Sequence, residues 1–559
     1  MNETFKEVPS VWTTGWTDIL NTGTWRSAIP IYQKRLAPCH CACPVDGEIP
    51  TWIMLARKQL YYEAWSVLVS NNPFPAVTGR ICHHPCEAAC NRGEYDGKVS
   101  VNALEQYIGD LALSEGWTLP QPTVELAQRV AVIGGGPAGL SCAYQLRQLG
   151  YKVSLFDARS ELGGALRYGI PRYRLSKEIL DKEIARLLTL SLDVKLNHQV
   201  KASDLGQLEN DYSAVFIALG AQNSKTLPQF SVDDLRVSKA LDFLETVNRG
   251  NTPSLGQEVV VIGGGSVALD VAGTVRRLSS QVKVLALEDR ESLPAQPDEL
   301  TESLDEGVEI VAGVMVQNVG LSHEKISLNC IRVTLDDTAP VGILSPIPLS
   351  GTEFSVSATN VILAVGQEAE LTGWESVVNV GQSLIRVDAN LATNRSGVFA
   401  GGDVTPVERF VSTAIGQGKT AALSIDKYLN IPNSKGHGSK EAGGLQDEVS
   451  YQEINTFYFP EMTREEKGTV TVEQRLQNFA EYKIGFTPQQ TQYQSERCFS
   501  CGNCVECDNC FYFCPDMAVV KDPSLEEHYR ILDQFCKGCG SCVQECPRGA
   551  VVLKEETRR

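Results

Sequence analysis

The stretch Arg129-Val-Ala-Val-Ile-Gly-Gly-Gly-Pro-Ala-Gly139 decides the fold of the middle of this 559-residue chain. Its first five residues predict a buried parallel strand, and its glycines lead into an apolar helical pattern over residues 140–149. Gly134 permits a tight turn, Gly136 lets a pyrophosphate approach the backbone, and Gly139 allows the helix to pack on the strand. The helix N-terminus adds the positive end of a dipole. The stretch therefore predicts a dinucleotide-binding domain.

A second copy of this pattern lies further along the chain. The first copy continues into a strand over 152–156 that ends at Asp157, an acid placed to bind a ribose. In the second copy a strand over 258–262 precedes Gly263-Gly-Gly-Ser-Val-Ala268, and Ala268 still permits close helix packing. Glu288 favours the free 2'-hydroxyl of NADH, whereas Arg290 would suit a 2'-phosphate, so we predict NADH over NADPH. The candidate nucleotide-binding residues are Gly134, Gly136, Ala138, Gly139 and Asp157 in the first copy, and Gly263, Gly265, Ser266, Glu288 and Arg290 in the second.

Two cysteine runs near the C-terminus predict iron-sulfur chemistry. Each run has the spacing Cys-x2-Cys-x2-Cys-x3-Cys-Pro, over 504–515 and 536–547. In this spacing three cysteines hold one [4Fe-4S] cluster and the fourth crosses to the other. Zinc is the alternative for Cys-x2-Cys pairs, but two complete runs closed by Cys-Pro favour iron-sulfur clusters. We expect one cluster at Cys504, Cys507, Cys510 and Cys546, and a second at Cys536, Cys539, Cys542 and Cys514.

Composition limits the compartment and the partners. The formal net charge is -18 and the pI about 5.0, which argues against a nucleic-acid or anionic-membrane partner. No basic region followed by an apolar run occurs within Met1 to Leu20, and no transmembrane run is found. Sixteen of the 18 cysteines fall in four tight groups, which favours metal ligation over disulfides, and only Cys142 and Cys330 stand apart. We predict a soluble, cytoplasmic protein.

Further glycine segments carry a resemblance to a known family. Ala218-Leu-Gly220, Ala364-Val-Gly366 and Gly401-Gly-Asp403 occur in an order that resembles the two-dinucleotide flavoproteins. The resemblance implies FAD at the first fingerprint, NAD(P)H at the second, and a helix over 412–429 beside the flavin. It adds Gly220, Gly366, Gly402 and Asp403 to the cofactor-binding candidates. The redox dithiol of the disulfide reductases is missing, because residues 143–497 contain only Cys330, so thiol exchange is not expected.

The N-terminal cysteines narrow this resemblance. Pro38-Cys-His-Cys-Ala-Cys-Pro44, Cys82-x3-Cys-x3-Cys90 and Gly163-Gly-Ala-Leu-Arg-Tyr-Gly-Ile-Pro171 are similar to the glutamate synthase small subunit and to the N-terminal part of dihydropyrimidine dehydrogenase. The likeness covers roughly residues 35–430. Residues 167–171 are expected to help to form the pocket in which nicotinamide meets flavin, and Gly164 and Arg167 are added to the cofactor-binding candidates. The likeness also implies one cluster held by Cys43, Cys82, Cys86 and Glu105.

The second N-terminal cluster of that family is not fully matched. Cys39 and Cys90 occupy two of its ligand positions, but its longer cysteine run is absent and Cys41 stands at an unmatched spacing. Either Cys39, Cys41 and Cys90 share an altered cluster, or one N-terminal cluster survives with Cys39 or Cys90 among its ligands. Cys498 and Cys501 precede the ferredoxin pattern as alternative ligands, an accessory site or metal-free structure. We expect roughly three to four [4Fe-4S] clusters.

The predicted fold class is α/β with two smaller modules. We expect a helical N-terminal iron-sulfur domain, a Rossmann-like FAD domain with an inserted Rossmann-like NAD(P)H domain, and a C-terminal α+β ferredoxin domain. Residues around 451–459 are expected to form a strapping segment after glycine-rich, acidic chain. The expected bounds are 1–127 for the helical domain, 128–222 with 367–430 for FAD, 223–366 for NAD(P)H, 431–495 for a linker and 496–559 for the ferredoxin domain.

The predicted function is electron transfer. NADH gives up two electrons together as a hydride, whereas a cubane carries one electron at a time. A flavin is therefore needed between them. We predict an NAD(P)H:acceptor oxidoreductase subunit that exchanges electrons with ferredoxin or a partner catalytic subunit, such as a 2-oxoacid oxidoreductase. The alternative is a glutamate synthase small subunit that serves a glutaminase-containing large chain. No side chain is expected to act as acid, base or nucleophile, and the direction of flow stays open.

Overall fold

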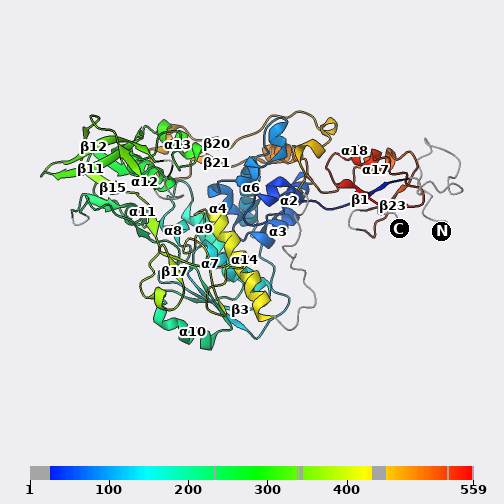
Figure 1. Cartoon of the computed structure of the whole chain (residues 1–559), viewed down its shortest axis with the longest axis horizontal. Helices are drawn as coiled ribbons and strands as arrows, with labels where there is room; N and C mark the ends of the chain where they lie inside the picture. Colours follow the sequence, from blue (N-terminus) through cyan, green and yellow to red (C-terminus); the bar gives the residue numbers. More distant parts are fainter. Residues whose placement is uncertain are drawn as a thin grey trace.

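The computed structural model describes residues 26–231, 234–336, 338, 344–430, 448–525 and 528–556. The molecule is elongated, with the C-terminal module at one end, the N-terminal helices in the middle and the second dinucleotide-binding domain at the other end (Figure 1). The expected absence of a targeting segment over 1–20, and the glycine-rich stretch within 431–447, lie outside the described residues. No helix among the described residues is long and apolar enough to cross a membrane.

The N-terminal helical domain is built on short helices that cross closely. Their bounds are α1 Pro38–Cys41, α2 Ile49–Arg57, α3 Tyr61–Asn71, α4 Pro75–Ile81, α5 Pro85–Ala88, η2 Asn91–Glu94 and α6 Val101–Ser114. Proline occupies the first turn of α1, α2, α4 and α5, where its missing N–H leaves no bond unmade. Gly79 and Gly109 let α4 and α6 touch, since a Cβ on either would lie 2.4 Å from backbone atoms of the other helix. Trp52 and Trp65 fill the core beneath them.

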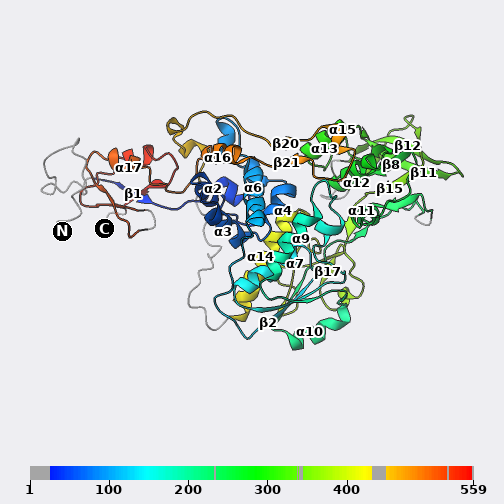
Figure 2. The same cartoon turned by 180° about the vertical axis from the view of Figure 1, so that it is seen from behind.

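The first dinucleotide-binding domain has a parallel sheet of order β19-β5-β2-β3-β4. The strands are β2 Arg129–Ile133, β3 Lys152–Phe156, β4 Asp193–Lys195, β5 Ala214–Ile217 and β19 Val398–Ala400. Four of the five β2 residues are buried, as the apolar run predicts for a strand covered on both faces. The helices are α7 Pro137–Gln148, α8 Ala165–Tyr168, α9 Lys177–Leu188, η3 Ala202–Asp204, α10 Leu205–Asp211 and α14 Val411–Leu429. Helix α14 runs alongside α7 (Figure 2).

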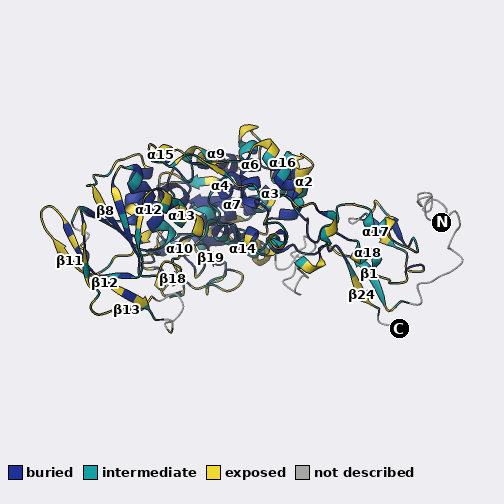
Figure 3. Ribbon diagram, turned by 90° about the horizontal axis from the view of Figure 1, so that it is seen from above, coloured by how far each residue is buried: buried dark blue, intermediate teal, exposed yellow. Residues whose placement is uncertain are grey.

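The second domain repeats this plan and adds an antiparallel sheet. Its parallel sheet has the order β10-β9-β8-β15-β7, with β7 Val237–Lys239, β8 Glu258–Ile262, β9 Gln281–Leu285, β10 Glu309–Val311 and β15 Asn360–Leu363. Its helices are α11 Ala240–Asn248, α12 Ser266–Arg277 and α13 Pro297–Asp305. The added strands are β11 Val314–Leu321, β12 Ile326–Leu335, β13 Pro346–Pro348 and β14 Phe354–Ala358. Their outer positions are exposed, whereas the centre of the molecule is buried (Figure 3).

The chain crosses between the two domains at one place. Strand β6 Asn223–Ser224 pairs antiparallel with β16 Gln367–Glu368, so the outgoing and returning segments lie side by side. This pairing is consistent with a nicotinamide domain inserted between about residues 223 and 366. After it come η4 Trp374–Ser376, β17 Val380–Gly381 and β18 Leu384–Ile385, which lead back to the first sheet.

Residues 448–496 carry short elements that strap across the other domains. The elements are η5 Tyr451–Glu453, η6 Thr456–Tyr458, β20 Gly468–Thr469, α15 Val472–Arg475, β21 Lys483–Ile484 and α16 Pro488–Glu496. Glu481 pairs with Arg80 at 2.8 Å and accepts a 2.7 Å bond from the Ser176 amide, while Lys483 pairs with Glu302. The strap thus contacts the helical domain and both dinucleotide-binding domains. A strapping segment is predicted around 451–459, and the strap extends beyond that range because polar residues further along also pair with fixed charges.

The C-terminal module contains a strand from the N-terminal part of the chain. Strand β1, Ala28–Tyr32, pairs antiparallel with β24, Val551–Glu555. The module also contains α17 Asn509–Tyr512, β22 Val519–Lys521, β23 Tyr529–Ile531 and α18 Ser541–Gln544. Strand β1 thus pairs with the C-terminal module although it lies within the range 1–127 expected for the helical domain. No local turn signal reveals this pairing, because the two strands lie at opposite ends of the sequence.

Candidate functional site

One cavity of about 790 Å³ joins the two dinucleotide-binding domains. It opens at the carboxyl ends of β2 and β8, where each fingerprint turns into a helix. Ligands of open α/β sheets bind at this edge. The cavity is lined by most of the predicted nucleotide-binding residues, namely Gly134, Gly136, Ala138, Asp157, Gly164, Gly220, Gly263, Gly265, Ser266, Glu288, Gly366, Gly402 and Asp403.

The first fingerprint has the close contacts that its glycines predict. Gly134 has φ +109°, and a Cβ there would lie 2.2 Å from the Ala218 carbonyl oxygen. A Cβ on Gly139 would lie 1.8 Å from the Gly134 carbonyl oxygen, so this glycine lets α7 pack on the loop and does not line the cavity. Gly136 differs, because a Cβ on it would meet nothing nearer than 3.8 Å. The space in front of Gly136 therefore fits a pyrophosphate approaching the N-terminus of α7.

Asp157 braces this loop. Its carboxylate accepts 2.7 Å hydrogen bonds from the Gly135 and Arg159 amides. Burial raises the pKa of Asp157, and the two amides and the Arg159 charge oppose that rise. Asp157 lines the cavity, so the same carboxylate supports the turn and is available to a ribose hydroxyl.

Gly402 and Asp403 close the first site from the opposite side. Gly402 has φ +75°, and its amide donates a 2.6 Å hydrogen bond to Gln417 of α14. Burial raises the pKa of Asp403, and the Arg409 charge opposes it. Gly220, with φ +70°, has no atom within 4 Å of a built Cβ. The open space at Gly220 fits a long cofactor such as FAD.

The turn of the second fingerprint has the same close contact as the turn of the first. Gly263 has φ +134°, and a Cβ on it would lie 2.3 Å from the Ala364 carbonyl oxygen. Gly265 faces open space, because a Cβ built on it would lie 4.0 Å from the nearest atom. The Glu288 carboxylate lies beside the loop, 2.9 Å from a Cβ built on Gly264. This acid therefore stands where a ribose of a second nucleotide would lie.

Two predicted side chains do not reach the cavity. Arg290 is exposed and does not line it. The Arg167 guanidinium turns away, donating a 2.6 Å bond to the Leu162 carbonyl and pairing with Asp181. Tyr168 and Ile170, from the same predicted segment 167–171, do line the cavity. Sequence reasoning also missed Arg409, whose only signal is its position six residues after Asp403.

Cys43, Cys82, Cys86 and Glu105 are brought together beneath the N-terminal helices. Burial raises the pKa of Cys82 to about 12, with the nearby Glu105 and Cys43 adding to the rise. Burial is also the main cause of a raised pKa at Cys86, and Cys43 and Cys82 add to that rise. Glu105 accepts hydrogen bonds of 2.8 Å from Thr78 and 2.9 Å from Asn72, and burial raises its pKa to about 7. Three thiols and a carboxylate thus face one place, a donor set that suits a cluster with one oxygen ligand.

This cysteine site adjoins the nucleotide cavity through the first turns of α14. Ala414 lines the cavity, and the Ser412 hydroxyl, two residues earlier, opposes the burial-driven rise in the pKa of Cys82. Phe410 stacks on His83 with 3.7 Å between ring centroids. One short segment therefore touches both sites, and the protein places the N-terminal cysteines next to the flavin side of the cavity.

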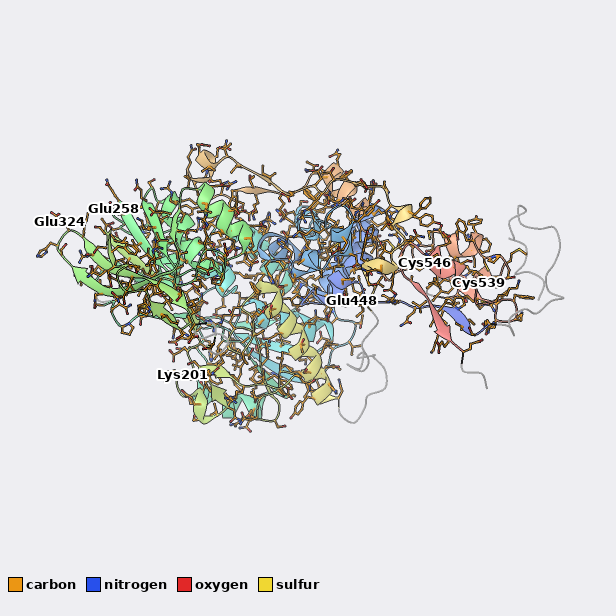
Figure 4. The ribbon with its side chains drawn as sticks, turned by 45° about the horizontal axis from the view of Figure 1, so that its top comes forward. Lys201, Glu258, Glu324, Glu448, Cys539 and Cys546 are labelled. Carbon is orange, nitrogen blue, oxygen red and sulfur yellow. The ribbon has the colours of Figure 1, made fainter. Side chains whose placement is uncertain are left out.

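The C-terminal cysteines form two separate groups, each around a small cavity. Cys514, Cys536, Cys539 and Cys542 line one cavity, and Cys504, Cys507, Cys510 and Cys546 line the other. Each group contains one cysteine from the opposite run, as the crossed spacing predicts. Cys539 and Cys546 lie in the module at one end of the molecule, far from Glu258 and Glu324 of the second dinucleotide-binding domain (Figure 4). In the described part of the chain, no three His, Cys, Asp or Glu are spaced to hold a single metal ion, whereas a four-iron cube needs wider spacing.

Cys39, Cys41 and Cys90 do not form one group. Cys41 is exposed, and burial together with Glu448 raises its pKa. Cys39 and Cys90 lie near one another, since the Cys90 thiol adds to the rise that burial causes in the pKa of Cys39. The structure therefore does not bring Cys41 to the predicted altered cluster.

The fold and these sites define a class of protein, a two-dinucleotide flavoprotein joined to iron-sulfur modules. Residues 128–418 match the pyridine nucleotide-disulphide oxidoreductase family. Residues 31–117 match domain II of dihydropyrimidine dehydrogenase, a 4Fe-4S module, and residues 503–550 match the 4Fe-4S dicluster domain. The chain belongs to the pyridine nucleotide-disulphide oxidoreductase family, as a glutamate synthase small-chain-like member with a C-terminal dicluster module. The predicted fold class and family resemblance are confirmed.

Three relatives illustrate the range of this family. The chain is 33% identical over 499 residues to the NADP(+)-dependent formate dehydrogenase subunit beta of Moorella thermoacetica, covering 83% of this chain and 70% of the relative. It is 32% identical to the glutamate synthase [NADPH] small chain of Azospirillum brasilense, covering 70% and 86%. It is 32% identical to the NAD-dependent dihydropyrimidine dehydrogenase subunit PreT of Escherichia coli, covering 70% and 91%. The predicted class of function, a flavin and iron-sulfur oxidoreductase subunit, is confirmed. The choice between NADH and NADPH stays a prediction.

Proposed function

We propose that this chain is an NADH-linked electron-transfer subunit that exchanges electrons between NADH, FAD and [4Fe-4S] clusters. When bound, FAD exchanges one hydride, and so two electrons, with the nicotinamide, and single electrons with the clusters. The observation that carries the proposal is the single cavity lined by both fingerprints and bordered by the Cys82 site through Ser412 and Ala414. The chain's own residues bind and orient, and none of them needs to move a proton.

NADH is proposed as the nucleotide because of where two side chains lie. Glu288 lines the cavity beside the second fingerprint, and its charge would repel a 2'-phosphate. Arg290, the side chain that would attract such a phosphate, is exposed and outside the cavity lining. The relatives include both NADP-dependent and NAD-dependent proteins, so the geometry of Glu288 is the supporting observation.

The proposed acceptor or donor is ferredoxin or a partner catalytic subunit. The dicluster module lies at one end of the molecule, opposite the nicotinamide domain (Figure 1). The glutamate synthase alternative receives less support, because that relative matches 70% of this chain whereas the formate dehydrogenase subunit matches 83%. The distal module favours a carrier or catalytic subunit with its own substrate chemistry.

A ferredoxin assay tests this function. Anaerobically purified full-length protein should reduce ferredoxin with NADH, or form NADH from reduced ferredoxin and NAD+, with one NADH per two electrons. Gly265→Val, which fills the open space of the second fingerprint, should abolish both directions while FAD remains bound. Activity that appears only with a glutaminase-containing large chain would instead establish the glutamate synthase alternative.

A further inference from the structure

Seven cysteines remain after the ligand sets above are assigned. Cys142 lies in α7 and Cys330 in β12, both buried in apolar cores, and Cys41 is exposed. The remaining four are Cys39 and Cys90 of the helical domain and Cys498 and Cys501, which precede the ferredoxin pattern. More than 400 residues separate the two pairs in the sequence, so nothing local predicts that they meet.

The segment that carries Cys498 and Cys501 is seated firmly on the helical domain. Arg497 is fully buried, and its guanidinium donates bonds of 2.6 Å to the Gly97 carbonyl and 3.0 Å to the Lys98 carbonyl. In return, Arg92 donates to the Arg497 carbonyl and lies 4.9 Å from the centre of the Phe499 ring. These contacts fix the backbone on both sides of Cys498 against the loop that follows Cys90.

The four thiols converge on one place between these segments. Asn91 follows Cys90 directly, and its side-chain nitrogen Nδ2 lies 3.5 Å from the Cys501 sulfur. Cys501 is 8% exposed, and Cys39 packs against the same small apolar cluster. Burial raises the pKa of Cys39 well above its usual value, and the neighbouring Cys90, Cys498 and Cys501 add to the rise. Burial, Cys498 and Cys90 likewise raise the pKa of Cys501 to about 12, against the effect of Asn91.

Four clustered thiols of this kind have a clear chemical use. Metal-bound thiolates are deprotonated outright, so a bound metal cluster suits four thiols that are buried side by side. Four cysteines around one point are the ligand set of a [4Fe-4S] cluster. We propose that Cys39, Cys90, Cys498 and Cys501 hold a further [4Fe-4S] cluster, assembled jointly by the helical domain and the segment before the ferredoxin module.

This site lies between the other cluster sites. Toward the cavity, Cys39 is a neighbour of Cys86. Burial and nearer groups raise the pKa of Cys86 most, and Cys39 adds a smaller rise. Toward the ferredoxin module, Arg548 is buried, its guanidinium contacts the Cys498 carbonyl at 3.4 Å, and it lines the cavity of Cys504 and Cys546. The Gly502 amide also donates a 2.7 Å bond to the Arg548 carbonyl. The proposed cluster therefore connects the N-terminal site to the ferredoxin pair.

Its role rests on the proposed function and completes the electron path. One electron enters from the cluster at Cys43, Cys82, Cys86 and Glu105 and one leaves to the cluster at Cys504, or the reverse, with no bond made or broken. Two passages balance one NADH, whose hydride supplies both electrons and whose proton is released at the nucleotide cavity. The ligands come from two modules, so the cluster also couples their docking to electron transfer.

Iron and sulfide content of full-length, anaerobically purified protein tests the proposal. The wild type should contain about sixteen irons and sixteen sulfides per chain, and the Cys498→Ser/Cys501→Ser double variant should contain about four fewer of each. The matched control Cys41→Ser, at an exposed cysteine outside the set, should lose none. NADH should still bleach the flavin in the double variant, and failure of that reaction would count against the proposed function instead.

A second measurement on the wild type covers the case in which the double variant fails to fold. Cys498 and Cys501 should resist alkylation in the native protein and react after iron chelation under anaerobic denaturing conditions. Twelve irons with both thiols reactive in the native state would overturn the proposal. So would one zinc in place of four irons, a Cys498–Cys501 disulfide in protein never exposed to oxidant, or a double variant with unchanged iron.

Discussion

Gly416 of α14 lies directly against Pro44, and a Cβ on Gly416 would sit 2.0 Å from the Pro44 carbonyl oxygen. Pro44 follows Cys43, a predicted cluster ligand, and α14 reaches the nucleotide cavity at Ala414. Lys419, one turn further along α14, donates a 3.0 Å bond to the Val45 carbonyl. The helix that borders the flavin site therefore also fixes the loop that carries Cys43.

The Gly416→Ala variant should loosen this contact. A Cβ at 2.0 Å forces backbone apart, so we expect a fall in the thermal midpoint of several degrees, in line with a loss of about 1–3 kcal/mol for overpacking. Electron exchange between flavin and clusters should also slow. The matched control is Gly206→Ala in α10, where a Cβ meets nothing within 4 Å. Equal midpoints for the two variants would contradict this description of the contact.

The Glu288→Ala substitution should weaken the binding of NADH more than the binding of NADPH. The carboxylate is placed to accept ribose hydroxyls, and a hydrogen bond to a charged group contributes about 1.5–3 kcal/mol, or roughly 10- to 100-fold in affinity. Nucleotide titrations of the flavoprotein measure both dissociation constants. The control is Glu291→Ala, an exposed acid three residues on. Parallel losses for both nucleotides would show that Glu288 does not select between them.

The two fingerprints should be separable by matched valine substitutions. Gly136 and Gly265 both have extended backbone, and both face open space, with built Cβ atoms 3.8 and 4.0 Å from the nearest atoms. Gly136→Val should yield protein without flavin, whereas Gly265→Val should keep FAD and lose its response to NADH. Flavin absorbance and NADH bleaching provide the readouts. If Gly265→Val loses flavin and Gly136→Val keeps it, the assignment of the two sites is reversed.

Lys177 should make stability depend on pH. Its ammonium donates bonds of 2.9 and 2.6 Å to the Leu166 and Ile170 carbonyls, yet burial, with Arg167 and Arg172 nearby, lowers its pKa to about 7. The unfolded chain, with a pKa near 10.5, then binds more protons between about pH 7 and 10. Stability should therefore fall as pH drops through this window and level off below it.

The Lys177→Met variant should lack this dependence. The thermal midpoint of the wild type, measured relative to Lys177→Met, should be lower at pH 7 than at pH 9. Lys182→Met, on the exposed face of α9, is the control and should follow the wild type at both values. A constant difference between wild type and Lys177→Met would show that Lys177 does not change its charge in this range.

Local patterns predicted the nucleotide-binding core closely. The strands expected at 129–133, 152–156 and 258–262 have those bounds in the structure, and the helix expected from 412 begins at 411. The strands at 129–133 and 258–262 are apolar runs followed directly by glycines that must meet a neighbouring carbonyl, so sequence and geometry coincide there. The crossed cysteine groups of the ferredoxin module were also readable, because their spacing reflects the cluster itself.

Contacts between distant segments could not be predicted in this way. The pairing of β1 with β24, the strap at 448–496 and the meeting of Cys90 with Cys501 all join residues hundreds of positions apart. Arg167 was misplaced for a related reason. Its motif indicates the loop, but the direction of its guanidinium depends on Asp181, an acid on the following helix. Such choices are made by tertiary ion pairs and leave no periodic signal.

The central claim is that electrons pass between NADH and the clusters of this chain. Low-temperature EPR after rapid anaerobic mixing tests it most directly, with oxidised protein mixed with NADH, and dithionite-reduced, desalted protein mixed with NAD+. We predict that cluster signals change in at least one direction, with one NADH consumed or formed per two cluster electrons, and in neither direction in Gly265→Val. Cluster signals that stay unchanged in both directions, in wild-type protein that contains its flavin, would contradict the account.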